Sequence, residues 1–246
     1  MTLKSILIKM WNNAAEDSVK KICTLQEKGE SKKIICLGCH KGDIALSAAW
    51  RIGTNDIYGI DIQPKFLKEA SAKGINVIAA DLNKKFPIKD NSFDVVVSDQ
   101  VIEHLTNVDN FVKEMFRILK PEGYAVISTE NLSSWNNLFA LLFGYGPPSL
   151  TYSAEKRIEG GPLSPHHGEN STLEYPRHVY IFTYQALKEI FSVHGFSVER
   201  LIGGGYYPCP EFLMKIMSKI DPRHSQFLII KVRKEYKGGK NAQIET

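Results

Sequence analysis

Several features that mark specialised classes of protein are scarce in this chain. It has only four cysteines in 246 residues, irregularly placed at positions 23, 36, 39 and 209. This argues against a disulfide framework and predicts reduced thiols. No stretch reaches the ~18 consecutive apolar residues of a membrane span, and the first residues lack the apolar core and cleavage site of a signal peptide. The sequence therefore predicts a cytoplasmic protein without a transmembrane segment.

The chain also lacks a strong excess of either charge. Its 31 Lys+Arg against 27 Asp+Glu give a formal net charge of +4, spread evenly until the basic segment 231–240. Nucleic-acid binding cannot be inferred from so small an excess. With 43% hydrophobic and 24% charged residues the composition excludes disorder. We find no internal repeat, and the length fits one domain with an insertion.

Between residues 34 and 131, short apolar runs alternate with amphipathic segments. This alternation predicts βαβ units and hence an α/β fold with a parallel sheet. We expect strands at 33–37, 57–60, 76–80, 93–97 and 124–128, and two later ones at 196–202 and 227–232. Helices are expected around 13–28, before the fifth strand, at 184–194 and from residue 211.

A glycine turn joins the first expected strand to the next helix. Gly38 and Gly42 would let the backbone approach a ligand, and Asp61 follows the second strand 19 residues after Gly42. A glycine turn followed by a strand-terminal acid is the arrangement that binds a nucleoside-bearing cofactor. Asp81, after the third strand, can accept a hydrogen bond from an adenine amine. The alternative is an ordinary βα turn with structural aspartates.

Here the sequence resembles a known family, the class I S-adenosylmethionine-dependent methyltransferases. The resemblance rests on five ordered segments, IICLGCHKGDIA, YGIDIQPKFLKEA, AADLN, FDVVVSDQVIEHL and LKPEGYAVISTEN. It covers residues 33–131 strongly and 182–232 loosely. It implies a Rossmann-like three-layer sandwich with a mostly parallel seven-stranded sheet, an antiparallel last strand and a lid insertion. It also implies S-adenosylmethionine as the cofactor.

The resemblance assigns roles to particular residues. Gly38, Cys39 and Gly42 approach the methionine and ribose portions, Asp61 holds the ribose, Ile62 packs on the adenine, Asp81 and Leu82 define the adenine edge, and Ser98 and Gln100 line the methionine side. Two positions depart from the family pattern, because Cys36 stands where an acid is common and His40 replaces the middle glycine of the turn. Both departures are expected to reduce cofactor affinity without abolishing it.

Two histidines are candidate catalytic residues. His104, just past the fourth strand, is the best candidate base, needed if the acceptor is a hydroxyl or protonated amine. Glu103 could orient its imidazole or bind a metal, or both could be structural. His178 stands where related families place a histidine facing the active site, but it could also be a loop residue. Similar Glu-His segments form divalent-metal sites in quinone O-methyltransferases and RNA 3′-terminal methyltransferases. Because Gln100 replaces the earlier glutamate, we predict no metal site.

The chain is expected to form one methyltransferase domain with four parts. These are an N-terminal helical segment (1–32), a cofactor-binding core (33–131), a substrate lid insertion (132–182) and closing helices and strands (183–246). The apolar run 135–143 is read as a lid helix, or as a segment that touches a membrane surface. The expected reaction is O-methylation of a small molecule, with nitrogen or carbon as less favoured acceptors. The alternatives are methylation of RNA or another macromolecule, and a non-catalytic S-adenosylmethionine-binding protein.

Overall fold

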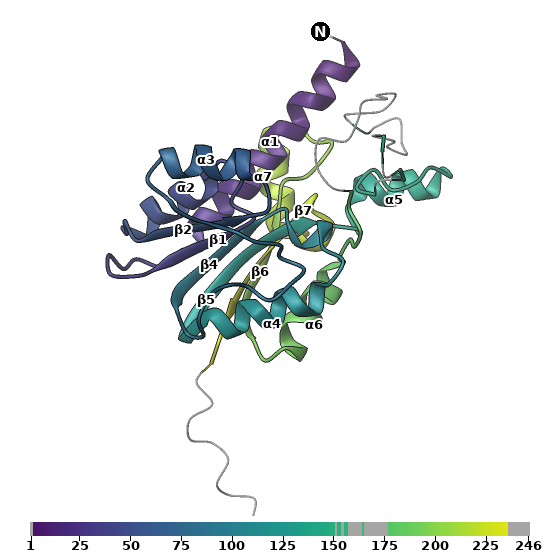
Figure 1. The fold of residues 1–246 in the computed structure, drawn as a ribbon. Coiled ribbons are helices and arrows are strands. Elements are labelled where there is room, and N and C mark those ends of the chain that lie inside the picture. Colours follow the sequence, from purple (N-terminus) through teal and green to yellow (C-terminus); the bar gives the residue numbers. More distant parts are fainter. Residues whose placement is uncertain (1, 151, 154, 157–163, 165–176, 236–246) are drawn as a thin grey trace, which may run out of the picture.

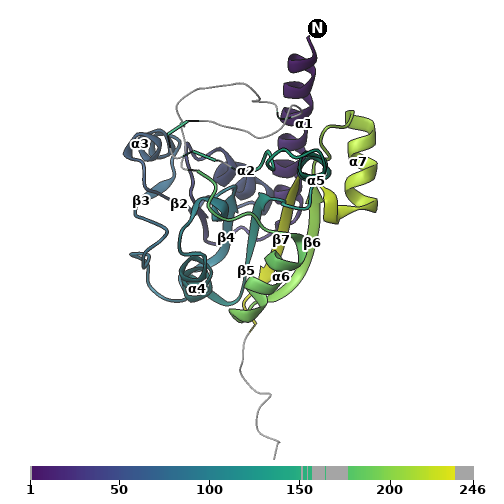
Figure 2. The same cartoon turned by 90° about the vertical axis from the view of Figure 1, so that its right-hand side faces the viewer.

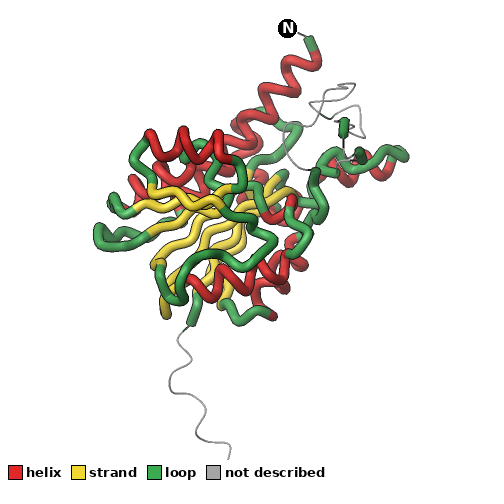
Figure 3. The backbone as a smooth tube through the Cα atoms, in the orientation of Figure 1, coloured by secondary structure: helices red, strands yellow, loops and turns green. Residues whose placement is uncertain are grey.

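The computed structural model describes residues 2–150, 152–153, 155–156, 164 and 177–235. Its centre is a seven-stranded sheet in the order β3-β2-β1-β4-β5-β7-β6, shown as the yellow layer in Figure 3. The strands are β1 (Ile34–Leu37), β2 (Ile57–Asp61), β3 (Asn76–Ala79), β4 (Phe93–Asp99), β5 (Leu119–Glu130), β6 (Ser197–Gly204) and β7 (Phe227–Arg233). Strands β1 to β5 pair in parallel, and β7 runs antiparallel to both β5 and β6. This confirms the predicted Rossmann-like sheet with an antiparallel last strand.

Helices cover both faces of the sheet (Figure 1 and Figure 2). They are α1 (Leu3–Thr24), α2 (Asp43–Ile52), α3 (Pro64–Ala72), α4 (Val108–Ile118), α5 (Trp135–Leu142), α6 (Tyr184–Val193) and α7 (Glu211–Ile220), with 3-10 turns η1 (Ile102–His104) and η2 (Pro222–His224). Because both faces are covered, β1 is apolar and buried throughout. Its side chains alternate, so that Ile34 and Cys36 pack with α1 and α2, while Ile35 and Leu37 pack with α4 and α6.

Two predicted elements differ from the structure by more than two residues at a boundary. The N-terminal helix, predicted around 13–28, begins at Leu3, where the Thr2 side chain accepts a hydrogen bond from Ser5 N at 3.2 Å, and it ends at Thr24. The fifth strand, predicted at 124–128, runs from Leu119 to Glu130. Its register against β4 is irregular between Phe93 and Val95, so residues 120–123 form a distortion within the strand.

The expected lid insertion is only partly described. Its first segment forms α5, as predicted, with the Ser134 hydroxyl accepting from Asn137 N at the helix start. The two ends of the insertion lie together, since Asn131 and Phe182 form a parallel bridge. Residues 157–163 and 165–176 lie outside the described residues. Closure of residues 132–182 over an acceptor stays a prediction.

A group of charges ties the segment that follows α1 to β7. Glu27 accepts hydrogen bonds from Lys231 at 2.6 Å, from Lys32 at 3.1 Å and from Arg233. Burial raises the pKa of Glu27, but these three cationic donors outweigh it and lower the pKa to about 2. The ionised Glu27 side chain therefore stabilises the folded protein at pH values above about 4.5, which is its pKa in the unfolded chain. This stabilisation is lost as the pH falls towards 2.

Replacing Glu27 by glutamine should consequently destabilise the protein in a pH-dependent way. We expect the melting temperature at pH 7 to fall by about 2–4 °C, the shift that ~1 kcal/mol produces in a chain of this length, because Glu27 is partly exposed and its ion pairs are screened. The difference should narrow as the pH falls from about 4.5 towards 2. Glu16→Gln, which breaks one exposed pair with Lys20, is the control. Equal shifts at pH 7 and pH 3 would contradict this account.

Candidate active site

A cavity of about 520 Å³ lies at the carboxyl ends of β1 to β4. This is where the sheet order reverses direction between β1 and β4, the position at which open α/β sheets bind ligands. The lining residues come from the connections after these strands and are Gly38, His40, Asp61, Ile62, Gln63, Phe66, Ala80, Asp81, Leu82, Asn83, Asp99, Gln100, Val101, His104 and Leu105. The cavity thus gathers most of the residues that the sequence singled out.

The turn after β1 has the backbone that its glycines suggested. Gly38 has a φ of +70°, and a Cβ there would lie 2.4 Å from Val101 Cγ2. Gly42 has a φ of +86° and approaches Ile75 equally closely, which lets α2 start against α3, but it does not line the cavity. Cys39 also lies outside the cavity wall, because its buried side chain packs against Gly59. Of the three predicted turn residues, only Gly38 reaches the cavity.

Asp61 occupies the centre of the cavity wall at the end of β2. Its Oδ2 accepts from His40 N and its Oδ1 from Gln63 N, both at 2.9 Å. Since each carboxylate oxygen has two lone pairs, Asp61 can accept two further hydrogen bonds from a bound ligand. The preceding turn is therefore built around this carboxylate, which fixes its position.

The predicted adenine side is present in the same wall. Asp81 Oδ1 accepts from Asn83 N at 2.9 Å, and this backbone bond contributes most to lowering the pKa of Asp81. The carboxyl group is therefore ionised at neutral pH. Ile62, 62% exposed, and Leu82, which is buried, supply apolar surface beside it. An apolar slot with one acceptor at its edge suits a flat ring that carries an amine.

The two departures from the family pattern have different consequences. Cys36 is buried in the middle of β1, where burial raises the pKa of its thiol well above the usual value, so it supplies no charge. His40 adopts a φ of +46° and donates its backbone N–H to Asp61, so the turn is retained without glycine. Its ring packs on Phe66 with the centroids 3.7 Å apart. His40 and Phe66 together form one side of the cavity.

At the end of β4, one contact expected from the sequence is wrong. Ser98, expected to line the methionine side, is fully buried and donates its hydroxyl to Leu37 O at 2.9 Å. It joins β4 to β1 beneath the cavity, because adjacent strand residues point to opposite faces. Asp99 and Gln100 do reach the cavity. The Gln100 amide donates to Ser128 Oγ at 3.0 Å, while that hydroxyl bonds Asp99, whose carboxyl pKa is raised by burial.

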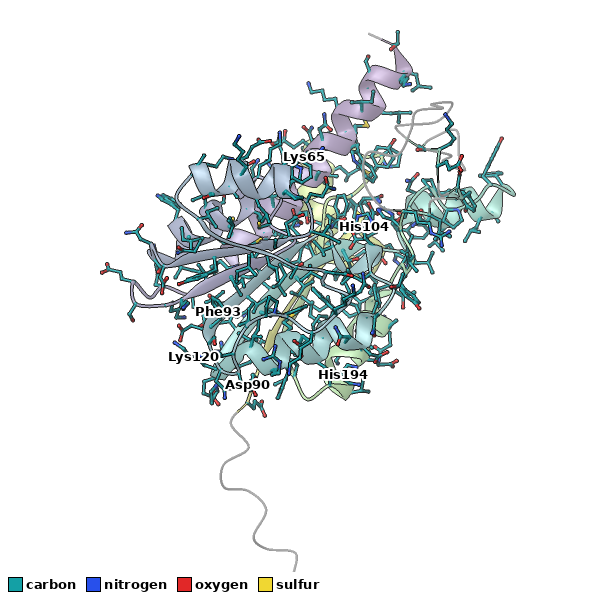
Figure 4. The ribbon with its side chains drawn as sticks, in the orientation of Figure 1. Lys65, Asp90, Phe93, His104, Lys120 and His194 are labelled. Atoms are coloured by element: carbon teal, nitrogen blue, oxygen red, sulfur yellow. The ribbon has the colours of Figure 1, made fainter. Side chains whose placement is uncertain are left out.

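The two candidate catalytic histidines lie side by side. His104, labelled in Figure 4, lines the cavity, and the centroid of its ring is 4.7 Å from that of His178. The two segments are joined by backbone bonds, since Val179 N and Tyr180 N both donate to Glu103 O. His178 Nδ1 donates to Ser149 O at 2.6 Å. In the neutral ring this leaves Nε2 as the basic nitrogen.

Glu103 lies behind this histidine pair. Its carboxyl group is fully buried, and Thr129 Oγ1 donates to Oε2 at 3.0 Å, whereas Oε1 meets no hydrogen-bond partner among the described residues. Burial raises the pKa of Glu103 to about 8, so the group holds its proton at pH 7. One atom each of Glu103, His104 and His178 lie within 4.8 Å of one another. Such a set can relay a proton or hold a divalent cation, although the sequence predicted no metal site.

Sequence reasoning missed several residues of the cavity wall, among them Gln63, Phe66, Asn83 and Leu105. Asn83 holds the wall together, because its Oδ1 accepts from Thr106 N at 2.8 Å and from Asn107 N at 3.1 Å. Their position in the sequence could have indicated them, since these four residues all lie within five residues of a predicted site residue.

Comparison with known proteins agrees with this geometry. A family model described as a methyltransferase domain matches residues 35–127. A demethylmenaquinone methyltransferase of Listeria monocytogenes is 29% identical over 190 residues, covering 72% of this chain and 73% of that protein. A sterol 4-C-methyltransferase of Caenorhabditis elegans is 30% identical over 57% of this chain and 47% of its own length. A 2-phytyl-1,4-naphtoquinone methyltransferase of Trichormus variabilis is 27% identical over 48% and 56%. The chain thus spans about half the length of the last two.

Solved structures share the fold. A putative S-adenosylmethionine-dependent methyltransferase from Listeria monocytogenes superposes with a TM-score of 0.63 at 19% identity, covering 93% of this chain and all of the other. A methyltransferase from Mesorhizobium loti gives 0.60 at 21% identity, with 89% and 97% covered. The matched domain and these superpositions show that residues 35–127 match a methyltransferase domain and that the chain has the fold of the class I S-adenosylmethionine-dependent methyltransferases.

Proposed function

We propose that this chain transfers a methyl group from S-adenosylmethionine to an oxygen atom of a small apolar molecule. The observation that carries the proposal is that one cavity is lined by the strand-end carboxylates Asp61 and Asp81 and by His104, whose ring lies 4.7 Å from that of His178. The first two are the groups that would hold a nucleoside, and the second two are groups that accept protons. Methyl transfer to an acceptor that must lose a proton needs both kinds of group next to each other.

The residues present fit the cofactor. Asp61 retains lone pairs for the two ribose hydroxyls, Asp81 offers an acceptor to the adenine amine, and Ile62 and Leu82 offer apolar contact to the ring. Gly38 keeps the backbone open beside Val101. When bound, the cofactor supplies a methyl group already activated by its sulfonium, so the protein contributes mainly alignment and proton removal.

Proton removal is the task of the histidine pair. A neutral imidazole nitrogen accepts the proton of an acceptor hydroxyl as the oxygen attacks, and the neighbouring ring stands within reach to share the resulting charge. The same chemistry serves a ring carbon next to a hydroxyl, which also loses a proton. The relative named a sterol 4-C-methyltransferase favours this second candidate. Relatives named for quinones and sterols support an apolar ring as the acceptor class.

The direct test combines binding and transfer. Isothermal titration with S-adenosylhomocysteine should give saturable binding with one site per chain. Incubation with methyl-labelled S-adenosylmethionine and a panel of hydroxylated quinones and sterols should place label in an organic-extractable product. Absence of binding at millimolar ligand would refute the cofactor assignment. Binding without label transfer to any fraction of a cell extract would instead indicate a non-catalytic binding protein, and label in RNA or protein would refute the small-molecule acceptor.

Chelation of metals should have little effect on this activity. A carboxylate must be deprotonated to bind a metal, whereas the buried Glu103 carboxyl holds its proton at pH 7 with a pKa of about 8. We therefore expect turnover in excess EDTA to stay within about twofold of the untreated rate, measured by label transfer. Loss of activity that added Mg²⁺ or Mn²⁺ restores would contradict this, and would place a divalent cation at Glu103, His104 and His178.

A further inference from the structure

Two neighbouring helices expose apolar side chains to solvent. On α7, Phe212, Ile216 and Ile220 lie one turn apart on one face and are 71%, 52% and 73% exposed. On α5 and just after it, Trp135, Phe139, Leu142 and Phe143 are exposed in the same manner. Residues 212, 216 and 220 are four positions apart, as are 135, 139 and 143, and 142 follows 139 by three. Each set therefore lies on a single helix face. Apolar side chains gathered in this way mark an interaction surface.

The two faces form one surface. Trp135, the first residue of α5, donates its indole N–H to Asp221 Oδ2 at 3.2 Å, and Asp221 is the residue that ends α7. The same N–H lies 2.7 Å from Tyr206 OH, and the Trp135 ring packs on His224 with the centroids 4.7 Å apart. The start of α5 and the end of α7 therefore lie together, and Figure 1 shows α5 extending outward from this point. We call this surface, made of the exposed side chains of α5 and α7, the apolar edge.

Positive charge accompanies the apolar edge. Lys215 and Lys219 are exposed on α7 between the apolar side chains, at positions i+3 and i+7 from Phe212. Lys9 and Lys20 of α1 lie close enough to lower the pKa of Glu211, after the larger effect of Lys215 itself. Glu211 and Glu16 are paired with Lys215 and Lys20. Asp17, paired with Lys21 beside α7, and Asp221 at the end of α7 belong to the same region, so five lysines against four acidic side chains leave a small excess of positive charge.

The apolar edge is also connected to the active site. Asn137 of α5 donates its amide to Ser149 Oγ at 3.1 Å, and Ser149 O accepts from His178 Nδ1 at 2.6 Å. Ser149 Oγ in turn donates to the buried Glu130 at 2.8 Å. A continuous set of hydrogen bonds therefore links the helix that carries Phe139 and Leu142 to the histidine pair.

We propose that the apolar edge binds the surface of an anionic lipid bilayer, with the aromatic and aliphatic side chains of α5 and α7 in the headgroup region and Lys215 and Lys219 against lipid phosphates. Interfacial helices combine these features, an apolar face and adjacent lysines. Among the residues that the structure describes, no helix is long and apolar enough to cross a membrane, so the contact is peripheral. A second copy of the chain fits less well, because a two-fold contact would bring the lysine-bearing face against itself.

The proposed bilayer binding does not depend on the proposed function. The idea that an apolar acceptor reaches the enzyme from the bilayer does depend on it. The experiment is therefore vesicle co-sedimentation without cofactor or acceptor. Vesicles of equimolar phosphatidylcholine and phosphatidylserine should bind the protein, and phosphatidylcholine alone should bind it less. Phe212→Ser with Ile216→Ser should weaken binding at least about tenfold, since each replaces an apolar side chain that would lie in the headgroup region. Lys215→Ala with Lys219→Ala should lower binding to the anionic vesicles only.

Val193→Ser is the matched control, because Val193 is 74% exposed on α6, away from the apolar edge. All variants should keep the wild-type melting temperature and affinity for S-adenosylhomocysteine. Failure of the wild-type protein to bind anionic vesicles would overturn the proposal, as would equal binding by the Phe212 and Ile216 variant. A dimer in light scattering that the same variant dissociates would also overturn it, and would assign the apolar edge to a second copy of this chain.

Discussion

Replacement of Asp61 by alanine is expected to weaken binding of S-adenosylhomocysteine at least ~100-fold. Hydrogen bonds to a charged acceptor contribute about 1.5–3 kcal/mol each, so loss of two bonds to ribose hydroxyls costs about 3–6 kcal/mol. The same change removes the acceptor of His40 N and Gln63 N, which orders the turn. Isothermal titration at fixed pH and salt measures the effect directly.

A conservative variant distinguishes a direct loss of ligand binding from a loss of the fold. Asp61→Asn keeps the shape of the side chain and one acceptor oxygen, and should weaken binding at least about tenfold by removing the charge. Asp43→Asn is the matched control, because Asp43 starts the adjacent α2, is exposed, pairs with Lys73 and does not line the cavity. It should bind the ligand as the wild-type protein does. If Asp61→Asn binds within threefold of wild type, Asp61 does not hold the ribose.

Replacement of His104 by alanine should abolish most of the methyl transfer while leaving cofactor binding nearly intact. A positioned proton acceptor contributes about 10²–10⁴-fold to a rate, so we expect kcat to fall within that range on an acceptor that loses a proton. His178→Ala should give a comparable loss, and the double variant less than the product of the two, because the neighbouring rings act on the same proton. Single-turnover transfer of the labelled methyl group measures the chemical step.

The control for this prediction is His194→Ala. His194 follows α6 and pairs with Asp109 at 2.7 Å, and Figure 4 shows it far from His104. Its removal should leave kcat unchanged. An acceptor that is deprotonated in solution, such as a thiolate, should be methylated at nearly the wild-type rate by His104→Ala, because no proton remains to be removed. Equal losses of rate with both kinds of acceptor would show that His104 positions the substrate rather than accepts its proton.

Local pattern was sufficient for the sheet and its ligand-binding edge. Strands are recognised by their apolar runs, and in a parallel sheet every strand ends at the same edge. Asp61 and Asp81 could therefore be placed together without any knowledge of packing, and the structure confirms that they share one cavity. The glycine at position 38 could be assigned in the same way, because its positive φ belongs to the turn itself.

Side-chain direction near the strand ends could not be read from the same pattern. Ser98 and Gln100 are two residues apart, yet only Gln100 reaches the cavity, because its φ of +53° turns the chain out of the strand while Ser98 is held by Leu37 O. Cys39 was placed at the ligand for its position in the turn, but its side chain packs under Gly59. Both outcomes depend on the exact course of the backbone, which neighbouring strands impose.

The sequence by itself determined which segments form strands, the nucleoside end of the site and the two histidines worth testing, because each depends on residues close together in the chain. Only the tertiary structure decided that His104 and His178 meet, that Glu103 is fully buried, and that α5 and α7 meet at Trp135 and Asp221. The physical reason is distance along the chain. Burial and contact between remote segments arise from packing, which local periodicity does not encode.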